Sequence, residues 1–289
     1  MSGRAPTLAI IGGSGLYDVS ELDVPEEVRI DTPYGPPSDA IIRGKLRGTD
    51  STLLFLPRHG RGHRHSPSSV NYRANICALK MLGATHLLSV SAVGSMREEI
   101  APGDLVVVDQ FIDLTKHRAS TFFDEVAAHV AFADPVCPIM AAAVFAAAGT
   151  TGARVHKGGT YVCIEGPQFS TRAESLLYRS WGVSVIGMTN MPEAKLAREA
   201  ELPFCTLALS TDYDCWHEGE EAVTVEAVVA TLRKNVALAR AAAAALGRNL
   251  PDVSASPATN ALKNAVMTDP AAITPAVRAR LGWLLDKYR

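Results

Sequence analysis

The sequence lacks the features that mark several classes of protein. Of its 289 residues, 28 are basic and 30 are acidic, so the formal net charge is only −2. The sequence has no excess of basic residues that would indicate a nucleic-acid partner, and no run of acidic residues that would indicate a solvating tail. Hydrophobic residues make up 47% of the chain and charged residues 20%, as in an ordinary globular protein. At this length one large α/β domain is as plausible as two small ones.

Cysteines are few and show no metal-binding or redox spacing. The five are Cys77, Cys137, Cys163, Cys205 and Cys215. Because their number is odd and no C-x-x-C pair occurs, we expect reduced, buried thiols and neither disulfides nor a zinc site.

Long hydrophobic runs are also missing. The most apolar segment, residues 139–148, is too short to cross a bilayer. The apolar stretch near the N-terminus is interrupted at once by glycines, unlike a signal peptide. We therefore expect a cytoplasmic protein with no membrane contact.

Short apolar runs rich in β-branched residues recur along the chain and are bounded by Gly, Pro or polar residues, as buried strands are. They are residues 8–11, 52–56, 86–90, 105–108, 161–164, 183–188 and 204–209. Helical patterns occur at residues 68–82, 170–181, 191–200, 223–246 and 275–288, and the first opens with serines suited to an N-cap. This alternation predicts an α/β fold with a central mixed β-sheet flanked by helices on both faces.

Two turns that follow strands are candidates for binding an anion. Gly12-Gly13-Ser14-Gly15 offers backbone amides and a hydroxyl, although it lacks the Lys of a P-loop, and a plain tight turn is an equal alternative. Residues 58–65, RHGRGHRH, carry Arg forks that match phosphate oxygens. A solvated loop is the alternative there, and no Asp or Cys at ligand spacing supports a metal site.

Polar segments lie at the carboxyl ends of three further predicted strands. Ligands gather at such ends in open α/β sheets. Residues 89–95, SVSAVGS, could equally form a structural turn. In residues 164–174, Phe169 could stack on a planar ring and Glu165 could act as an acid, a base or a hydroxyl partner. A strand-to-helix corner, with Phe169 in the core and Ser170 as the N-cap, is the alternative.

Two carboxylates, Asp212 and Asp214, stand in the segment STDYDCW at residues 210–216. From an extended loop both can reach one ligand, and partial burial can keep one of them protonated and ready to donate a proton. A solvated acidic turn, or N-capping ahead of the long helix that follows, explains the same residues equally well.

Taken together, these segments resemble the methylthioadenosine phosphorylase branch of the trimeric purine nucleoside phosphorylase family. The similarity runs from Leu8 to about Leu246 and includes the phrases DTPYGPPSDA, VNYRANICALK and MREEIAPGDLVVVDQFIDLTKHR. It implies one domain of the phosphorylase/hydrolase-like fold, residues 1–249. A C-terminal extension, residues 250–289, would pack on the same domain or on a neighbouring subunit. The resemblance also implies a homo-oligomer, expected to be a trimer, with no metal and no organic cofactor.

The resemblance assigns roles to individual residues. Phosphate, a cosubstrate, would be bound by Ser14, Arg58, His59, Ser91, Ala92 and Thr189. The purine would be contacted by Phe169, Ser170, Asp212 and Asp214, and the ribose by Met188. An apolar pocket for a 5′-methylthio group would be formed by Val223, Val225 and Val228, and a neighbouring subunit's site would be reached by His129.

The implied reaction is phosphorolysis of S-methyl-5′-thioadenosine to adenine and 5-methylthioribose 1-phosphate, in methionine and purine salvage, with adenosine as a further substrate. Asp212 is the candidate general acid, and Asp214 would bind the exocyclic amino group, which favours 6-aminopurines. The alternatives are a 6-oxopurine nucleoside or methylthioinosine phosphorylase, a hydrolytic nucleosidase, a dinucleotide-binding protein built on the Gly12–Gly15 turn, and a catalytically silent assembly partner.

Overall fold

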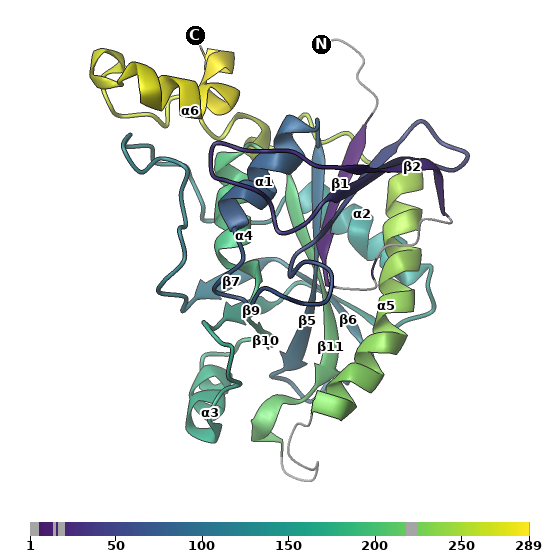
Figure 1. Cartoon of the computed structure of the whole chain (residues 1–289). Coiled ribbons are helices and arrows are strands. Elements are labelled where there is room, and N and C mark those ends of the chain that lie inside the picture. The colour runs from purple at the N-terminus through teal and green to yellow at the C-terminus, as the bar shows by residue number, and fades with distance from the viewer. Residues whose placement is uncertain (1–5, 14–15, 17–20, 218–224, 289) are drawn as a thin grey trace.

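The fold is a mixed β-sheet of eleven strands with α-helices on both faces (Figure 1). The computed structural model of the chain describes residues 6–13, 16, 21–217 and 225–288, with the backbone alone at 225–228 and 230. The predicted fold class is therefore confirmed, and each of the seven apolar runs overlaps a strand.

Four neighbouring strands run parallel and form the centre of the sheet. They are β4 (Thr52–Pro57), β1 (Thr7–Gly12), β5 (His86–Ser95) and β11 (Phe204–Asp212). Their side chains are buried almost throughout because helices cover both faces, which is why these strands read as continuous apolar runs.

Shorter strands extend the sheet on each side. Beyond β4 lie β3 (Ile41–Leu46) and the edge strand β2 (Leu22–Val28). Beyond the end of β5 lie β10 (Val185–Gly187), β9 (Thr160–Cys163) and β7 (Gln110–Asp113). Beyond β11 lie β6 (Leu105–Val108) and β8 (Val155–Lys157).

Two pairs of helices cover the sheet. On one side α1 (Tyr72–Met81) packs on α4 (Asn190–Glu199), and on the other α2 (Pro138–Gly149) packs on α5 (Val225–Arg248). Farther out lie α3 (Arg172–Ser180) and α6 (Pro275–Leu285) (Figure 1). Short 3₁₀ turns occupy Asp214–Trp216, Pro257–Asn260, Pro270–Ala272 and Asp286–Tyr288. Within the described residues, no helix combines the length and hydrophobicity needed to cross a bilayer.

Capping side chains determine where two of the helices begin. The Asn71 side chain accepts a hydrogen bond from the Ala74 amide and starts α1, so the prediction that serines at 68–69 cap this helix is wrong. Thr171 forms a capping box with Glu174 and starts α3, which excludes Ser170 as its N-cap.

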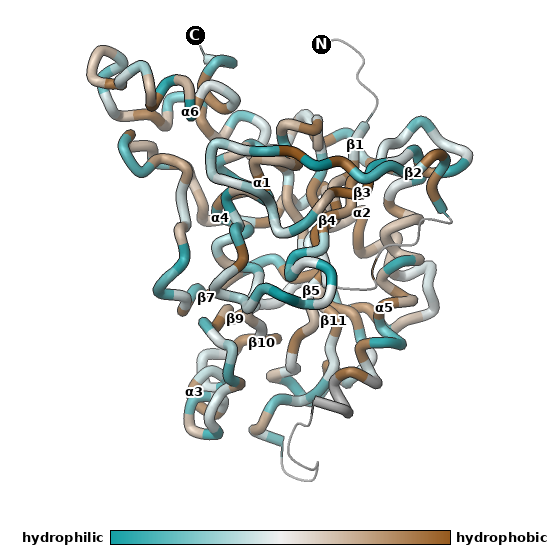
Figure 2. Tube along the Cα trace, viewed as in Figure 1, coloured by the Kyte–Doolittle hydropathy of each residue, from teal (hydrophilic) through white to brown (hydrophobic). Residues whose placement is uncertain are grey.

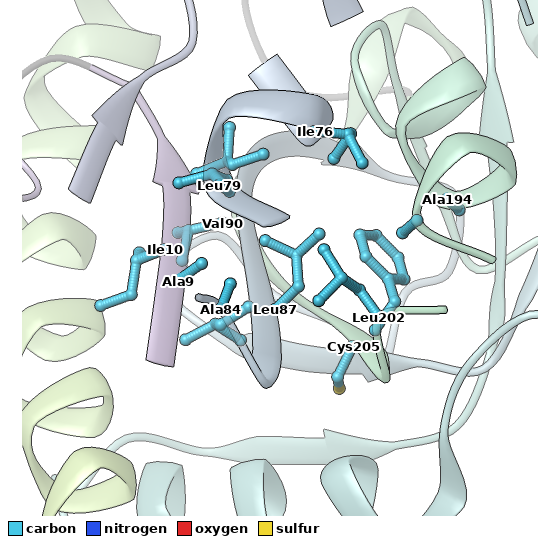
Figure 3. Close-up of a cluster of buried hydrophobic side chains, with 14 of the residues drawn as sticks. Ala9, Ile10, Ile76, Leu79, Ala84, Leu87, Val90, Ala194, Leu202 and Cys205 are labelled. Carbon is cyan, nitrogen blue, oxygen red and sulfur yellow. The ribbon is translucent and has the colours of Figure 1, made fainter. Parts of the chain in front are cut away.

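The apolar core lies between the sheet and the helices. Figure 2 shows hydrophobic residues concentrated on the central strands and hydrophilic residues on the outer loops. Figure 3 shows Leu87 of β5 in one buried cluster with Ile76 and Leu79 of α1 and Ala194 of α4. Because this dense packing fixes β5 and the strands beside it, polar residues at their carboxyl ends are held on a rigid frame.

Candidate active site

A cavity of about 440 Å³ opens at the carboxyl ends of the central strands, where ligands bind in sheets of this type. Its walls come from β5, β11, the turn after β4, the segment between β10 and α4, and α5. Ten residues expected to hold a ligand line it: Arg58, His59, Ser91, Ala92, Phe169, Ser170, Met188, Thr189, Asp212 and Asp214. Folding thus brings the separate sequence motifs to one place.

The remaining candidates are not placed at the cavity. Ser14 and Val223 lie outside the described residues, and only the backbone is described at Val225 and Val228. His129 does not line the cavity of its own chain, and its amide donates a hydrogen bond to the Ala265 carbonyl at 2.9 Å. Its role toward a neighbouring subunit stays a prediction.

Arg58 is fully buried at the cavity, and most of its hydrogen-bonding capacity is used within the protein. Its Nε and Nη2 donate to the two carboxylate oxygens of Glu193 at 2.9 and 3.0 Å, and Nη2 also donates to Ser89 Oγ at 2.8 Å. Nη1 donates to the Val90 carbonyl at 3.0 Å, so among the described residues one N–H of Nη1 is left for a ligand. Burial opposes the charge, but Glu193 outweighs it and raises the pKa of Arg58.

His59 meets the cavity as a neutral ring. Its Nδ1 lies 2.9 Å from the His65 carbonyl oxygen, and because a carbonyl only accepts, Nδ1 carries the hydrogen. Burial, reinforced by the Arg58 charge, lowers the pKa of His59 to about 4. Near neutral pH its Nε2 therefore holds a lone pair and must gain a hydrogen before it can donate to an anion. His63 stacks on this ring with centroids 4.2 Å apart.

Two hydroxyls add donors at the same end of the cavity. Ser91 comes from β5 and Thr189 immediately precedes α4, yet their oxygens are 3.1 Å apart. Tyr161 of β9 lies behind them, with its hydroxyl 3.1 Å from Ser91 Oγ. Together with the free N–H of Arg58, these hydroxyls form a compact donor set for a phosphate-sized anion.

The acidic pair lies farther along the same wall. Gly94 follows Ser91 on β5 by roughly 10 Å, at ~3.3 Å per residue, and a Cβ at Gly94 would lie 2.9 Å from Asp212 Oδ1. Asp212 accepts hydrogen bonds from the Thr211 hydroxyl at 2.7 Å and from the Asp214 amide at 2.8 Å. These donors hold the Asp212 carboxyl group in place at the cavity.

Asp214 has a different environment from its neighbour. Burial raises its pKa, against the hydrogen bond that it accepts from Ser175 at 2.5 Å. The φ angle of Asp214 is 54°, a left-handed conformation that Asp tolerates. The pair thus offers two carboxyl groups in different environments, of which burial biases Asp214 toward protonation, so it can accept and donate hydrogen bonds to a heterocycle. The resemblance, by contrast, assigns proton donation to Asp212.

Comparison with known proteins identifies this arrangement. The sequence matches the phosphorylase superfamily over residues 7–248. The chain belongs to this superfamily. It is 53% identical over 283 residues to a protein of Geobacter sulfurreducens named S-methyl-5′-thioadenosine phosphorylase, covering 97% of this chain and 98% of that protein.

Solved structures of phosphorylases agree with this assignment. A methylthioadenosine phosphorylase from an antarctic soil metagenomic library is similar with a TM-score of 0.90 and 49% identity, covering 98% of this chain and all of that one. A methylthioadenosine phosphorylase from Schistosoma mansoni, solved with adenine, is similar with a TM-score of 0.81 and 34% identity, over 97% and 98% of the two chains. The family resemblance expected from the sequence is confirmed.

In this phosphorylase fold the segment 164–174 forms part of the cavity rim. Phe169 is 56% exposed at the rim, so the alternative that places it in the core is wrong. The Ser170 hydroxyl is buried and has no hydrogen-bond partner among the described residues, which makes it available to a ligand. In the same part of the chain, no group of three or more His, Cys, Asp or Glu residues is placed to hold a metal ion.

Glu165, the other candidate acid or base, does not line the cavity. It pairs with the buried Arg118 at 3.2 Å and accepts hydrogen bonds from the Ser68 hydroxyl and the Lys116 amide. Burial would raise its pKa, but these bonds and the Arg118 charge lower it to about 2. Arg118 also donates to the Met188 carbonyl at 2.6 Å, so this pair holds the segment that carries Met188 in place.

Sequence reasoning missed two residues that support the site, Glu193 and Tyr161. Glu193 lies in a helical pattern and Tyr161 in an apolar strand, where charged surface residues and core aromatics are ordinary. No local spacing links either one to its partner, because Glu193 is 135 positions from Arg58 and Tyr161 is 70 positions from Ser91.

Proposed function

We propose that this chain is an S-methyl-5′-thioadenosine phosphorylase, which uses phosphate to release adenine and form 5-methylthioribose 1-phosphate. The observation that carries the proposal is one cavity with anion donors at Arg58, Ser91 and Thr189 and with an acidic pair beside Gly94, roughly 10 Å along β5 from Ser91. The names of the relatives that cover nearly the whole chain support the same substrate.

The chemistry follows from how charge develops in the reaction. As the bond between the anomeric carbon and the purine nitrogen breaks, its electron pair moves to the base and the ribose becomes oxocarbenium-like. A phosphate held by Arg58, Ser91 and Thr189 stabilises this cation and then bonds to the anomeric carbon. A proton from the acidic pair neutralises the departing base.

The acidic pair also bears on the base. An ionised carboxylate accepts a hydrogen bond from a 6-amino group, whereas a 6-oxo group would face it acceptor to acceptor. Adenine-type bases are therefore favoured over the alternative, a 6-oxopurine nucleoside or methylthioinosine phosphorylase. The valines at 223, 225 and 228 would favour a methylthio tail over a 5′-hydroxyl by only ~1–3 kcal/mol, so adenosine is a plausible second substrate.

The proposal extends to the working form of the enzyme. Phosphate is its cosubstrate, and neither a metal nor an organic cofactor takes part. It acts in the cytoplasm, in methionine and purine salvage, as a homo-oligomer, most simply a trimer. Exposed apolar side chains support contact with a neighbouring subunit: Phe169 at the cavity rim, Leu176 and Leu177 on α3, and Trp181 just after α3.

The direct test measures release of free base from methylthioadenosine, adenosine and methylthioinosine, each with and without phosphate. We expect adenine release that requires phosphate and is fastest with methylthioadenosine. Hypoxanthine release as the main activity would favour the 6-oxopurine alternative. Base release that is independent of phosphate would make the enzyme a hydrolase and refute the proposal.

His59 should accept a hydrogen bond from phosphate, because its ring is neutral with a lone pair on Nε2. At about pH 8, well above the ordinary histidine pKa, the phosphate dianion still carries one hydroxyl, which can donate to Nε2 without any change of protonation. Calorimetry of phosphate binding in buffers of different ionisation enthalpy should therefore show no net proton uptake. Net uptake that disappears in His59→Gln would contradict this role of His59.

A further inference from the structure

Tyr161 is completely buried in β9 and takes no direct part in the cavity wall. Its hydroxyl nevertheless lies 3.1 Å from Ser91 Oγ, and the Thr189 amide lies 3.5 Å from the same phenol oxygen. One buried hydroxyl therefore touches both hydroxyl residues of the anion site without itself lining the cavity.

The direction of these hydrogen bonds can be worked out. The Thr189 amide can only donate, so the phenol oxygen accepts from it and the single phenol hydrogen is left for Ser91 Oγ. Once Ser91 accepts from Tyr161, its own hydrogen points elsewhere. Its acceptors among the described residues are distant ones, the Ala92 carbonyl at 3.3 Å and the Thr189 hydroxyl at 3.1 Å. An anion in the cavity is a stronger acceptor than either, so it can draw the Ser91 and Thr189 hydrogens toward itself.

We propose that Tyr161 is a positioning residue of the phosphate site, which donates to Ser91 and thereby orients the Ser91 and Thr189 hydroxyls as donors to the anion. The inference rests on the proposed function, since it assumes that phosphate binds at this end of the cavity. It adds a residue that never touches the substrate.

Two features of the surroundings suit Tyr161 to this role. Burial raises the pKa of Tyr161 to about 12, so the phenol keeps the hydrogen that it donates. The ring is also held firmly, because it packs against Phe111 with centroids 5.8 Å apart and fills the space that a side chain at position 187 would need. A Cβ at Gly187 would overlap the Tyr161 hydroxyl, so glycine is required at 187 for this geometry.

The first test compares Tyr161→Phe with the wild type in steady-state kinetics. Loss of one hydrogen bond should raise the KM for phosphate by about 3- to 10-fold, while the KM for the nucleoside changes less than two-fold. Tyr34→Phe is the matched control, because it removes a phenol hydroxyl that lies 3.5 Å from the Phe122 carbonyl and away from the cavity. An unchanged phosphate KM in Tyr161→Phe, or equal increases in both KM values, would overturn the proposal.

The second test is a double-mutant cycle with Ser91→Ala, which removes the group through which Tyr161 acts. In the Ser91→Ala background, Tyr161→Phe should change the phosphate KM by less than two-fold. A full effect in that background would mean that Tyr161 acts by general packing, against the proposal. If wild-type base release does not depend on phosphate at all, the proposed function fails first, so the two failures are distinguishable.

Discussion

Replacing Asp212 by asparagine is expected to lower kcat by about 10²–10⁴-fold, the range that a positioned general acid contributes. Asparagine keeps the shape of the side chain but cannot pass a proton to the departing base. The phosphate KM should change little, because Asp212, on β11, lies beside Gly94, which is roughly 10 Å along β5 from Ser91. Rates of adenine release at saturating phosphate and nucleoside check this, with Asp50→Asn on the exposed turn between β3 and β4 as the control.

The companion variant Asp214→Asn separates the roles within the pair. Burial raises the pKa of Asp214, whereas Asp212 accepts hydrogen bonds from the Thr211 hydroxyl and the Asp214 amide. If Asp212 is the proton donor, Asp214→Asn should mainly raise the KM for the 6-aminopurine nucleoside. A large loss of kcat in Asp214→Asn with near-full turnover in Asp212→Asn would transfer proton donation to Asp214 and refute the assignment.

The central strands could be predicted from the sequence because helices cover both of their faces. β1 and β4 are buried on both sides and read as unbroken apolar runs. The edge strand β2 escaped prediction because most of its residues are exposed and Pro25 interrupts it. The helix α2 was missed because its Ala-rich sequence has no polar face to give it a helical period.

Some residues of the candidate site could likewise be predicted from the sequence, and others could not. Residues that face the cavity were recognised because Arg, Ser and Asp at strand ends are typical of ligand sites, and the structure brings Arg58, Ser91 and Asp212 to one cavity. The sequence could not indicate how many N–H groups of Arg58 remain available to bind a ligand. Its pairing with Glu193 joins the turn after β4 to α4, and only the folded chain brings these two segments together.

Glu193→Gln is expected to destabilise the fold by about 3–5 kcal/mol, the cost of breaking a buried ion pair by neutralising one partner. The Arg58 and Glu193 side chains are only 2% and 1% exposed, and Glu193 also accepts a hydrogen bond from Ser89 at 2.6 Å. Without the carboxylate, the Arg58 charge would remain buried without compensation. The midpoint of urea unfolding measures the loss. Glu26→Gln is the control, since its pair with Arg43 is half exposed and worth ~0–1 kcal/mol.

The double variant Arg58→Met/Glu193→Leu distinguishes stability from function at this pair. Apolar side chains of similar size can replace a buried ion pair with little loss of stability, so the double variant should unfold close to the wild type. It should still fail to use phosphate, because Arg58, which lines the cavity, no longer offers an N–H to the anion. Equal unfolding midpoints for Glu193→Gln and the wild type would show that the pair does not stabilise the fold. Undiminished use of phosphate by the double variant would show that Arg58 does not bind it.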